Sequence, residues 1–387
     1  MPSSLLRPKP TDEDLAKPVG MLDLHEESGL AAIRECGVYD AFLPLTGECA
    51  ESNIVADQDG NLLWADQGEL SLRPEISRNA LHRLLVSNLP PESIQWSHKL
   101  VSATSITVSG HTETELDFGA HGKHTFDLVI GADGAWSKVR NVLTDVKPRY
   151  SGIQNINVTI RHITSKYPKL AELVGAGTFM ALGTKHGVMS QRTSQDSARI
   201  YFVLSTADEH FATVFGLEGK SAEQAKDILL NHDALLKPWG SIIKELVAVA
   251  CDEESADNPG TAADIKPLYM LPVGHTWENR PGVTLIGDAS HLMCPWAGEG
   301  VNLAMWDSLL LSRAIIQAYE GAEGESRSFQ SALDPLVKAF EVDMWARAKE
   351  KADETVANCE LMFGGDDSAK AMADMFKSFM SPQGSGL

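Results

Sequence analysis

The sequence predicts an α/β protein, α+β overall, that folds into more than one domain. The chain has 387 residues, which corresponds to two or three domains at roughly 100–200 residues each. Hydrophobic residues make up 43% of the chain and charged residues 22%, a balance typical of globular cores rather than of disorder. Short apolar runs typical of buried strands alternate with segments whose apolar residues follow a helical period.

The charge balance argues against polyanions as the main partners. Acidic residues number 53 and basic residues 33, which gives a formal net charge of −20. Because nucleic acid and anionic membranes are bound through basic surfaces, we expect neither as a partner. No apolar run approaches the ~18 residues of a membrane-spanning helix, and the N-terminus lacks the apolar core of a signal peptide. The five scattered cysteines form no C-x-x-C pattern, so we expect a cytoplasmic protein without structural zinc.

The N-terminal part predicts a tail followed by a helix, a hairpin and a second helix. Residues 1–20 hold four prolines and no apolar period, so a disordered tail is expected there. The segment 30–36 has apolar residues at helical spacing. Asp59-Gly60 lies between two strand-like runs and predicts a β-hairpin. Ser77 is placed to cap the N-terminus of the next helix.

The rest of the chain mixes strands and helices. The apolar run Thr125–Ile130 closes at Gly131, as expected of one buried strand. The elements predicted after it are the strands Ile156–Ile163, Arg199–Leu204 and Val283–Ile286, the helices Ala222–Leu230, Ile242–Ala250, Gly300–Ala318 and Phe329–Met362, and a frayed tail over 381–387.

A first glycine-rich segment, G-A-D-G-A-W-S-K-V-R, spans residues 131–140 and follows the predicted buried strand. Such a turn lets the backbone approach a ligand at the carboxyl end of a strand, where α/β sheets bind cofactors. An ordinary strand–turn–helix connection is an equally good interpretation of this segment taken alone.

A second segment, G-D-A-S-H-L-M-C-P-W-A-G-E-G-V-N, spans residues 287–302. The carboxylate of Asp288 follows a strand and can accept hydrogen bonds from sugar-type hydroxyls. Gly298 and Gly300 remove side chains just before a helix, so that free N–H groups and the positive end of the helix dipole face an anionic ring or phosphate. A plain turn followed by a helix entry is the simpler alternative.

Taken together and in this order, the two segments resemble the motifs of flavin-dependent aromatic monooxygenases of the para-hydroxybenzoate hydroxylase type. Residues 131–140 match GADGxxSxVR, and residues 287–302 match GDAxHxxxPxxGxGxN. Residues 21–25 and 74–81 are similar to the tetracycline-modifying branch of these enzymes. The resemblance covers most of the chain, from about residue 21 to about residue 348.

The resemblance implies a non-covalent FAD enzyme that hydroxylates an aromatic or polyketide-like small molecule. O2 would supply the oxygen and NAD(P)H would act as a transient reductant, while the protein contributes positioning and electrostatics rather than a dedicated catalytic side chain or a metal. The cofactor-binding residues that it implies are Arg78, Asp133, Arg140, Asp288, Pro295, Gly298, Gly300, Val301 and Asn302. Placement in the sequence suggests as substrate-lining residues Met189, Gln191, Arg192 and Phe202.

The implied roles differ along the cofactor. Asp288 would bind the ribitol or pyrophosphate region, and Arg78 would reach the ribityl side. The segment 298–302 would line the isoalloxazine, with the helix dipole stabilising negative charge on the reduced ring. Asp133 and Arg140 would belong to the motif that serves both flavin and reductant.

The resemblance also divides the chain into domains. An FAD-binding, Rossmann-like domain is expected over 21–149 and 276–325, with a mixed-sheet substrate domain inserted over 150–275. A C-terminal helical segment and tail are expected over 326–387.

The sequence departs from the family pattern in one large respect. The strand–GxGxxG–helix unit that holds the ADP half of FAD does not occur in the chain. We therefore expect an incomplete FAD-binding domain, a truncated form of the enzyme and impaired FAD binding. The alternative is a catalytically inactive relative that acts as a small-molecule binding or interaction fragment. In smaller departures, Cys294 stands where proline is usual and Glu299 where glutamine is frequent.

Other interpretations are weaker. His121 and His124 have metal-ligand spacing, but no recognisable further ligands lie nearby, so a solvated turn is favoured. His291 with Ser290 suggests a hydrolase, but the G-x-S-x-G elbow is absent. The methionines near the C-terminus could form a partner-binding face, although core packing is their usual role.

Overall fold

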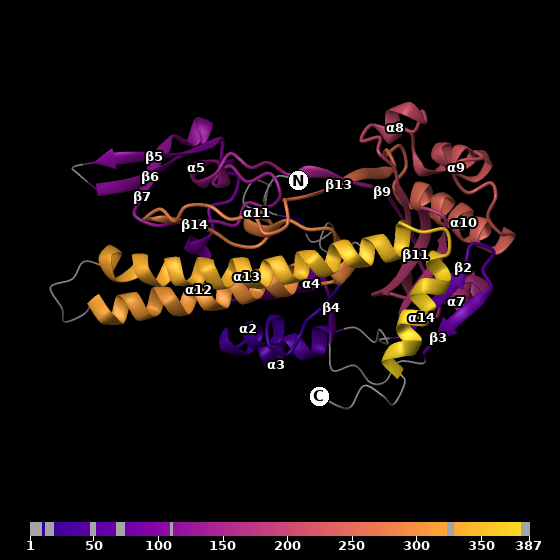
Figure 1. Cartoon of the computed structure of the whole chain (residues 1–387), viewed down its shortest axis with the longest axis horizontal. Helices are drawn as coiled ribbons and strands as arrows, with labels where there is room; N and C mark the ends of the chain where they lie inside the picture. Colours follow the sequence, from indigo (N-terminus) through magenta and orange to yellow (C-terminus); the bar gives the residue numbers. More distant parts are fainter. Residues whose placement is uncertain are drawn as a thin grey trace.

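The computed structural model describes residues 10–11, 19–46, 52–66, 74–108, 111–322 and 329–380. The predicted tails, 1–20 for the most part and 381–387 entirely, lie outside these residues. Figure 1 shows a large sheet at one end of the molecule and two long helices that run from it toward smaller sheets at the other end. The predicted α/β class is confirmed.

A seven-stranded sheet forms one end of the molecule. Its strands, in spatial order, are β13 (Asp264–Met270), β9 (Arg149–Ile160), β12 (Ser197–Ser205), β11 (His186–Thr193), β10 (Thr178–Gly183), β2 (Asn53–Asp57) and β3 (Leu62–Ala65). Neighbouring strands are antiparallel except for the parallel pair β10–β2. The predicted hairpin around Asp59-Gly60 forms, with Gly60 at φ +85°. It joins this sheet, although its residues were expected to belong to the cofactor-binding part.

The two faces of the seven-stranded sheet are covered by different helices. One face packs against α7 (Pro168–Val174), α9 (Ala222–Asn231) and α10 (Ser241–Asp257) in the largest apolar core. The other face packs against the end of α13 (Phe329–Phe363) and against α14 (Ser368–Met380). Because side chains alternate along a strand, neighbours in sequence belong to different cores.

Three smaller sheets complete the described part of the chain. They are the parallel pair β14 (Val283–Leu285) and β8 (Val129–Gly131), the antiparallel pair β1 (Met21–Asp23) and β4 (Glu75–Ser77), and the meander β5 (Ser102–Val108), β6 (His111–Asp117) and β7 (Lys123–Phe126). The expectation of one buried strand over Thr125–Ile130 is wrong. Asp127 interrupts the apolar run, so β7 ends at Phe126 in the exposed meander and β8 begins separately at Val129.

Helices α12 (Gly300–Ala322) and α13 pack side by side along the molecule (Figure 1). The first half of α13 shares a core with β8 and β14, and its last turn reaches the large sheet. Helix α4 (Arg78–Ser87) begins as predicted, because the Ser77 hydroxyl accepts a hydrogen bond from the Ala80 amide at 3.1 Å. The remaining helices are α2 (Gly29–Glu35), α3 (Tyr39–Phe42), α5 (Arg140–Leu143), α6 (Ile163–Lys166), α8 (Phe211–Val214) and α11 (Asp288–His291). Across the described ranges, no helix is both long and apolar enough to cross a bilayer.

Candidate functional site

The turn that follows β14 presents a free carboxylate. Gly287 lies in the left-handed region at φ +57°, and its amide donates to the carboxylate of Asp307 at 3.0 Å. Asp288 follows at the start of α11 with an exposed side chain, and no described residue bonds its carboxylate. The turn therefore aims an unused acceptor at solvent from the carboxyl end of a strand, as the sequence predicted.

Asp307 is a residue that the sequence analysis missed. It lies on α12 with no exposed surface, and it accepts from His291 Nε2 at 2.6 Å and from Arg347 at 3.2 Å, in addition to the Gly287 amide. One carboxylate thus fixes the turn, α11 and α13 to α12. An aspartate among the apolar residues of a helix was the available signal, because a buried charge needs partners.

The entrance of α12 is open. Gly298 has φ +71°, and a Cβ atom built on Gly298 or on Gly300 would meet no other atom within 4 Å. Pro295 is exposed in the 3₁₀ turn Pro295–Ala297 that leads to this entrance; residues 295–299 are called the entrance turn below. Val301 packs on the α2–α4 core behind it. The backbone at the positive end of a 23-residue helix is therefore accessible to a flat or anionic ligand.

Asn302 joins the entrance to the N-terminal segment. Its side-chain oxygen accepts from the His25 amide at 2.9 Å and from the Ser28 hydroxyl at 3.4 Å, and its nitrogen donates to the Asp23 carbonyl at 3.0 Å. Gly29 is required beside it, because a Cβ there would lie 2.6 Å from the Asn302 oxygen. Buried Asn302 therefore holds the N-terminal segment 23–28 against the first turn of α12.

Asp133 braces the first sequence motif internally, and Arg140 joins this motif to the second. Asp133 accepts from the Ser137 hydroxyl and from the amide of Lys138 at 2.6 Å. The Arg140 guanidinium donates to the carbonyl oxygens of Ala135 at 2.6 Å and of Ala289 at 3.0 Å. Burial lowers the pKa of Arg140, and the charge of Asp133 opposes this shift. Both side chains have internal partners, so their predicted role toward flavin and reductant stays a prediction.

Part of the predicted substrate set lies on the sheet face that α14 covers, and Arg78 at the start of α4 acts on it electrostatically. Met189 lies directly across from Tyr201, and both belong to the apolar cluster that contains Trp296 of the entrance turn. Burial raises the pKa of Tyr201, while the positive charges of Arg199 and Arg78 lower it.

The four predicted substrate residues do not share one face. Gln191 pairs with Arg199 two positions from Met189 and shares its side of the sheet. Phe202 lies in the opposite core, under α9 and α10, and Arg192 bonds Asp196 at 2.7 Å on that opposite side. The structure therefore places Met189 and Gln191 on one side of the sheet, with Met189 in the same apolar cluster as Trp296, and the other two on the opposite side.

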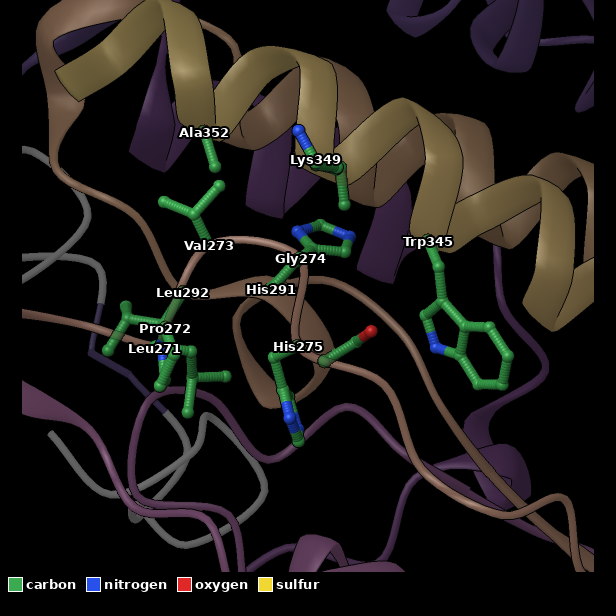
Figure 2. Close-up of a pocket in the computed structure, with 12 residues that line it drawn as sticks. Leu271, Pro272, Val273, Gly274, His275, His291, Leu292, Trp345, Lys349 and Ala352 are labelled. Atoms are coloured by element: carbon green, nitrogen blue, oxygen red, sulfur yellow. The ribbon is translucent and has the colours of Figure 1, made fainter.

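Two hollows lie elsewhere. A cavity of about 20 Å³, the size of one water, lies between the loop 271–275 and α13 (Figure 2). In Figure 2 His291 points toward α13, and His275 points away from it. A larger hollow of about 290 Å³ opens between α8 and β13, on the α9–α10 side of the sheet. Neither is lined by the residues of the α12 entrance.

The competing interpretations receive no support. His124 hydrogen-bonds the carbonyl of His121 on an exposed turn, and the described residues contain no cluster of three potential metal ligands. The Ser290 hydroxyl bonds the sulfur of Met344 at 3.4 Å rather than His291. Met372 is buried in the core beneath the sheet.

Comparison with known proteins gives a consistent result. Residues 275–330 match the model of an FAD binding domain. Monooxygenase penA of Penicillium thymicola is 33% identical over 402 residues, which cover 96% of this chain and 91% of that protein. Monooxygenase asqM of Emericella nidulans is 31% identical over 414 residues, which cover 97% of this chain and 91% of that protein.

Solved structures share the fold at lower identity. HpxO of Klebsiella pneumoniae, complexed with FAD and uric acid, has a TM-score of 0.68 at 16% identity and covers 94% of this chain and 85% of its own. A salicylate hydroxylase substrate complex has a TM-score of 0.67 at 17% identity, and the match covers 93% of this chain and 86% of that one. Tetracycline destructase Tet(55) has a TM-score of 0.60 at 18% identity, and the match covers 94% of this chain and 85% of that one.

Proposed function

The chain belongs to the FAD-dependent aromatic monooxygenases, and on this basis we propose that it hydroxylates an aromatic or polyketide-like small molecule with O2 and NAD(P)H. One observation carries the proposal. The free carboxylate of Asp288 and the side-chain-free entrance at Gly298 and Gly300 are held together, because Asp307 on α12 bonds the turn that bears Asp288.

These residues fit the ring and ribityl half of FAD. When bound, FAD would supply electron transfer and O2 activation. Asp288 would accept hydrogen bonds from ribityl hydroxyls, and Arg78 would lie on that side. The backbone at Gly298, Gly300 and Val301 would border the ring, where the helix dipole favours negative charge. Asn302 would keep the N-terminal segment closed against this edge.

Among the residues that the structure describes, no comparable cradle is present for the ADP half. The chain contains no G-x-G-x-x-G sequence, and β8 pairs with β14 alone in the part of the chain that the structure describes. A pyrophosphate would lack the glycine turn and helix N-terminus that usually hold it. We therefore propose that FAD binds weakly to this chain, and a non-catalytic binding fragment is the second candidate that this feature favours.

The substrate would lie between the entrance turn and the α14-facing side of the large sheet. Met189, Gln191 and Tyr201 would supply an apolar and polar lining there, and Met189 and Tyr201 belong to the same apolar cluster as Trp296. Buried aromatic and sulfur-containing side chains suit a flat apolar ligand.

The test is reconstitution with FAD, followed by measurement of NAD(P)H oxidation and of oxygen incorporation from ¹⁸O2 with a panel of phenols. Asp288→Ala should weaken FAD binding roughly tenfold or more, because an ionised acceptor contributes about 1.5–3 kcal/mol. It should leave the melting temperature unchanged, since the carboxylate is exposed. Glu320→Ala, which removes an exposed carboxylate from the far end of α12, is the matched control.

The outcomes separate the candidates. Labelled product that depends on Asp288 supports the monooxygenase. Ligand binding without NAD(P)H consumption, at saturating FAD, would favour the binding fragment.

A further inference from the structure

The entrance turn contains a buried acidic residue. Glu299 stands between the two open glycines and is only 9% exposed. A buried carboxylate is costly unless it is paired, and an unpaired one here would repel the anionic ligand that the helix dipole attracts.

Lys351 supplies the opposite charge from α13. Its ammonium lies 2.7 Å from Glu299 Oε1 and 3.2 Å from the exposed carboxylate of Glu354. Burial lowers the pKa of Lys351, but the hydrogen bonds and charges of Glu299 and Glu354 outweigh burial and raise it overall. The lysine therefore stays charged beside the turn.

His25 meets the other oxygen of the same carboxylate. Its Nδ1 lies 3.4 Å from Glu299 Oε2, and its Nε2 lies 3.1 Å from Asp23. The His25 side chain is 6% exposed, and Asn302 holds its backbone amide. Segments near residues 25, 299 and 351 thus converge on one carboxylate at the mouth of α12.

We propose that Lys351 is the built-in counter-ion of Glu299, and that this pair, with His25, positions the entrance and sets its preference for an anionic over a neutral ring. The inference rests on the proposed function, since reduced flavin is the anionic ring in question. Lys351 is a positioning residue in this scheme, because it acts through Glu299.

The scheme fixes the sign of each substitution. Lys351→Met leaves a buried carboxylate uncompensated next to the ring, so reduced flavin should bind less well relative to oxidised flavin. Glu299→Gln keeps the shape of the side chain but leaves the lysine with only the exposed Glu354 as a carboxylate partner, so the ratio should move the other way. The double variant removes both charges and should return close to the wild type.

The measurement is the midpoint potential of FAD bound to the full chain at pH 8, together with the dissociation constant of oxidised FAD and the melting temperature. We expect Lys351→Met to lower the ratio of reduced to oxidised affinity about tenfold, which corresponds to a potential about 30 mV more negative. We expect Glu299→Gln to raise the potential, and the double variant to lie within about threefold of the wild-type ratio, which is about 15 mV.

Lys349→Met is the matched control, because it removes the same charge from α13 two residues away, where Lys349 pairs with exposed Asp353. It should leave the potential unchanged. A purely structural pair would change the melting temperature but not the potential, and that result would overturn the inference. Equal potentials in wild type and Lys351→Met would overturn it while leaving the proposed function intact. A wild-type chain that binds no flavin would overturn both.

Discussion

At the scale of single residues, Asp307 holds the candidate site together. Its carboxylate receives the Gly287 amide, His291 and Arg347 without any exposed surface of its own. Such a residue touches no proposed ligand, yet it decides where Asp288 points.

Replacing Asp307 by Asn should therefore affect both stability and cofactor binding. Breaking a buried ion pair on one side leaves Arg347 with only the exposed Asp343 as a carboxylate partner, so the free energy of unfolding should fall by about 3 kcal/mol. Urea denaturation measures this, and FAD titration should show weaker binding. Asp343→Asn removes the other, exposed carboxylate partner of Arg347 and should cost far less. Equal losses in the two variants would contradict this role.

The half-buried imidazole of His275 should make the protein sensitive to mild acid. Burial, assisted by the charge of Arg140, lowers the pKa of His275 below its ordinary value of 6.5. Below that pH the unfolded chain binds more protons than the folded chain, so the free energy of unfolding decreases as the pH falls.

His275→Gln should flatten this decrease between pH 6.5 and 5, which unfolding measured across that range would reveal. Some slope should remain, because burial lowers the pKa of His186 as well. His124→Gln changes an exposed imidazole and serves as the control. An unchanged slope in His275→Gln would contradict the prediction.

At the scale of elements, the glycine at the start of α12 lowers the stability of the helix but leaves its N-terminus open to a ligand. Glycine in a helix is less favourable than alanine by roughly 0.5–1 kcal/mol. Gly300 begins α12, and the space around its missing side chain is empty.

Gly300→Ala should thus raise the melting temperature while lowering the affinity for FAD, since the methyl group would occupy the space meant for the ring. Gly321→Ala lies in the last turn of the same helix, also in open space, and should stabilise without affecting FAD. Differential scanning fluorimetry and flavin titration on the two variants separate the effects. Tighter FAD binding by Gly300→Ala would contradict a ligand at this entrance.

Elements with local signals were predictable from the sequence, and the capped helix after Ser77 and the hairpin at Gly60 formed as expected. The strand predicted over Thr125–Ile130 failed because its apolar content was read as one run, whereas pairing with β6 captures only its first part. The composition of a short segment does not report which partner strand each half meets or whether that half is buried, since β7 is exposed.

At the scale of the whole molecule, the features that could not be predicted from the sequence depend on contacts between residues far apart in the chain. Asp288 and the open glycines were available from the motif, but the cation beside Glu299 comes from a helix 52 residues later and the imidazole from 274 residues earlier (351 − 299 and 299 − 25). Phe202 and Arg192 were assigned by placement alone, and the alternation of a strand put them on the other face. Only the assembled sheet distinguishes its two sides.

The parallel pairing of β2 with β10 has a practical consequence for building chimeric enzymes. A recombinant that exchanged residues 150–275 between two homologues would leave the donor's hairpin behind, because β2 and β3 are encoded far upstream. The transplanted segment would then have to recruit two foreign strands. If the segment Asn53–Ala65 were exchanged as well, all seven strands would come from the same homologue.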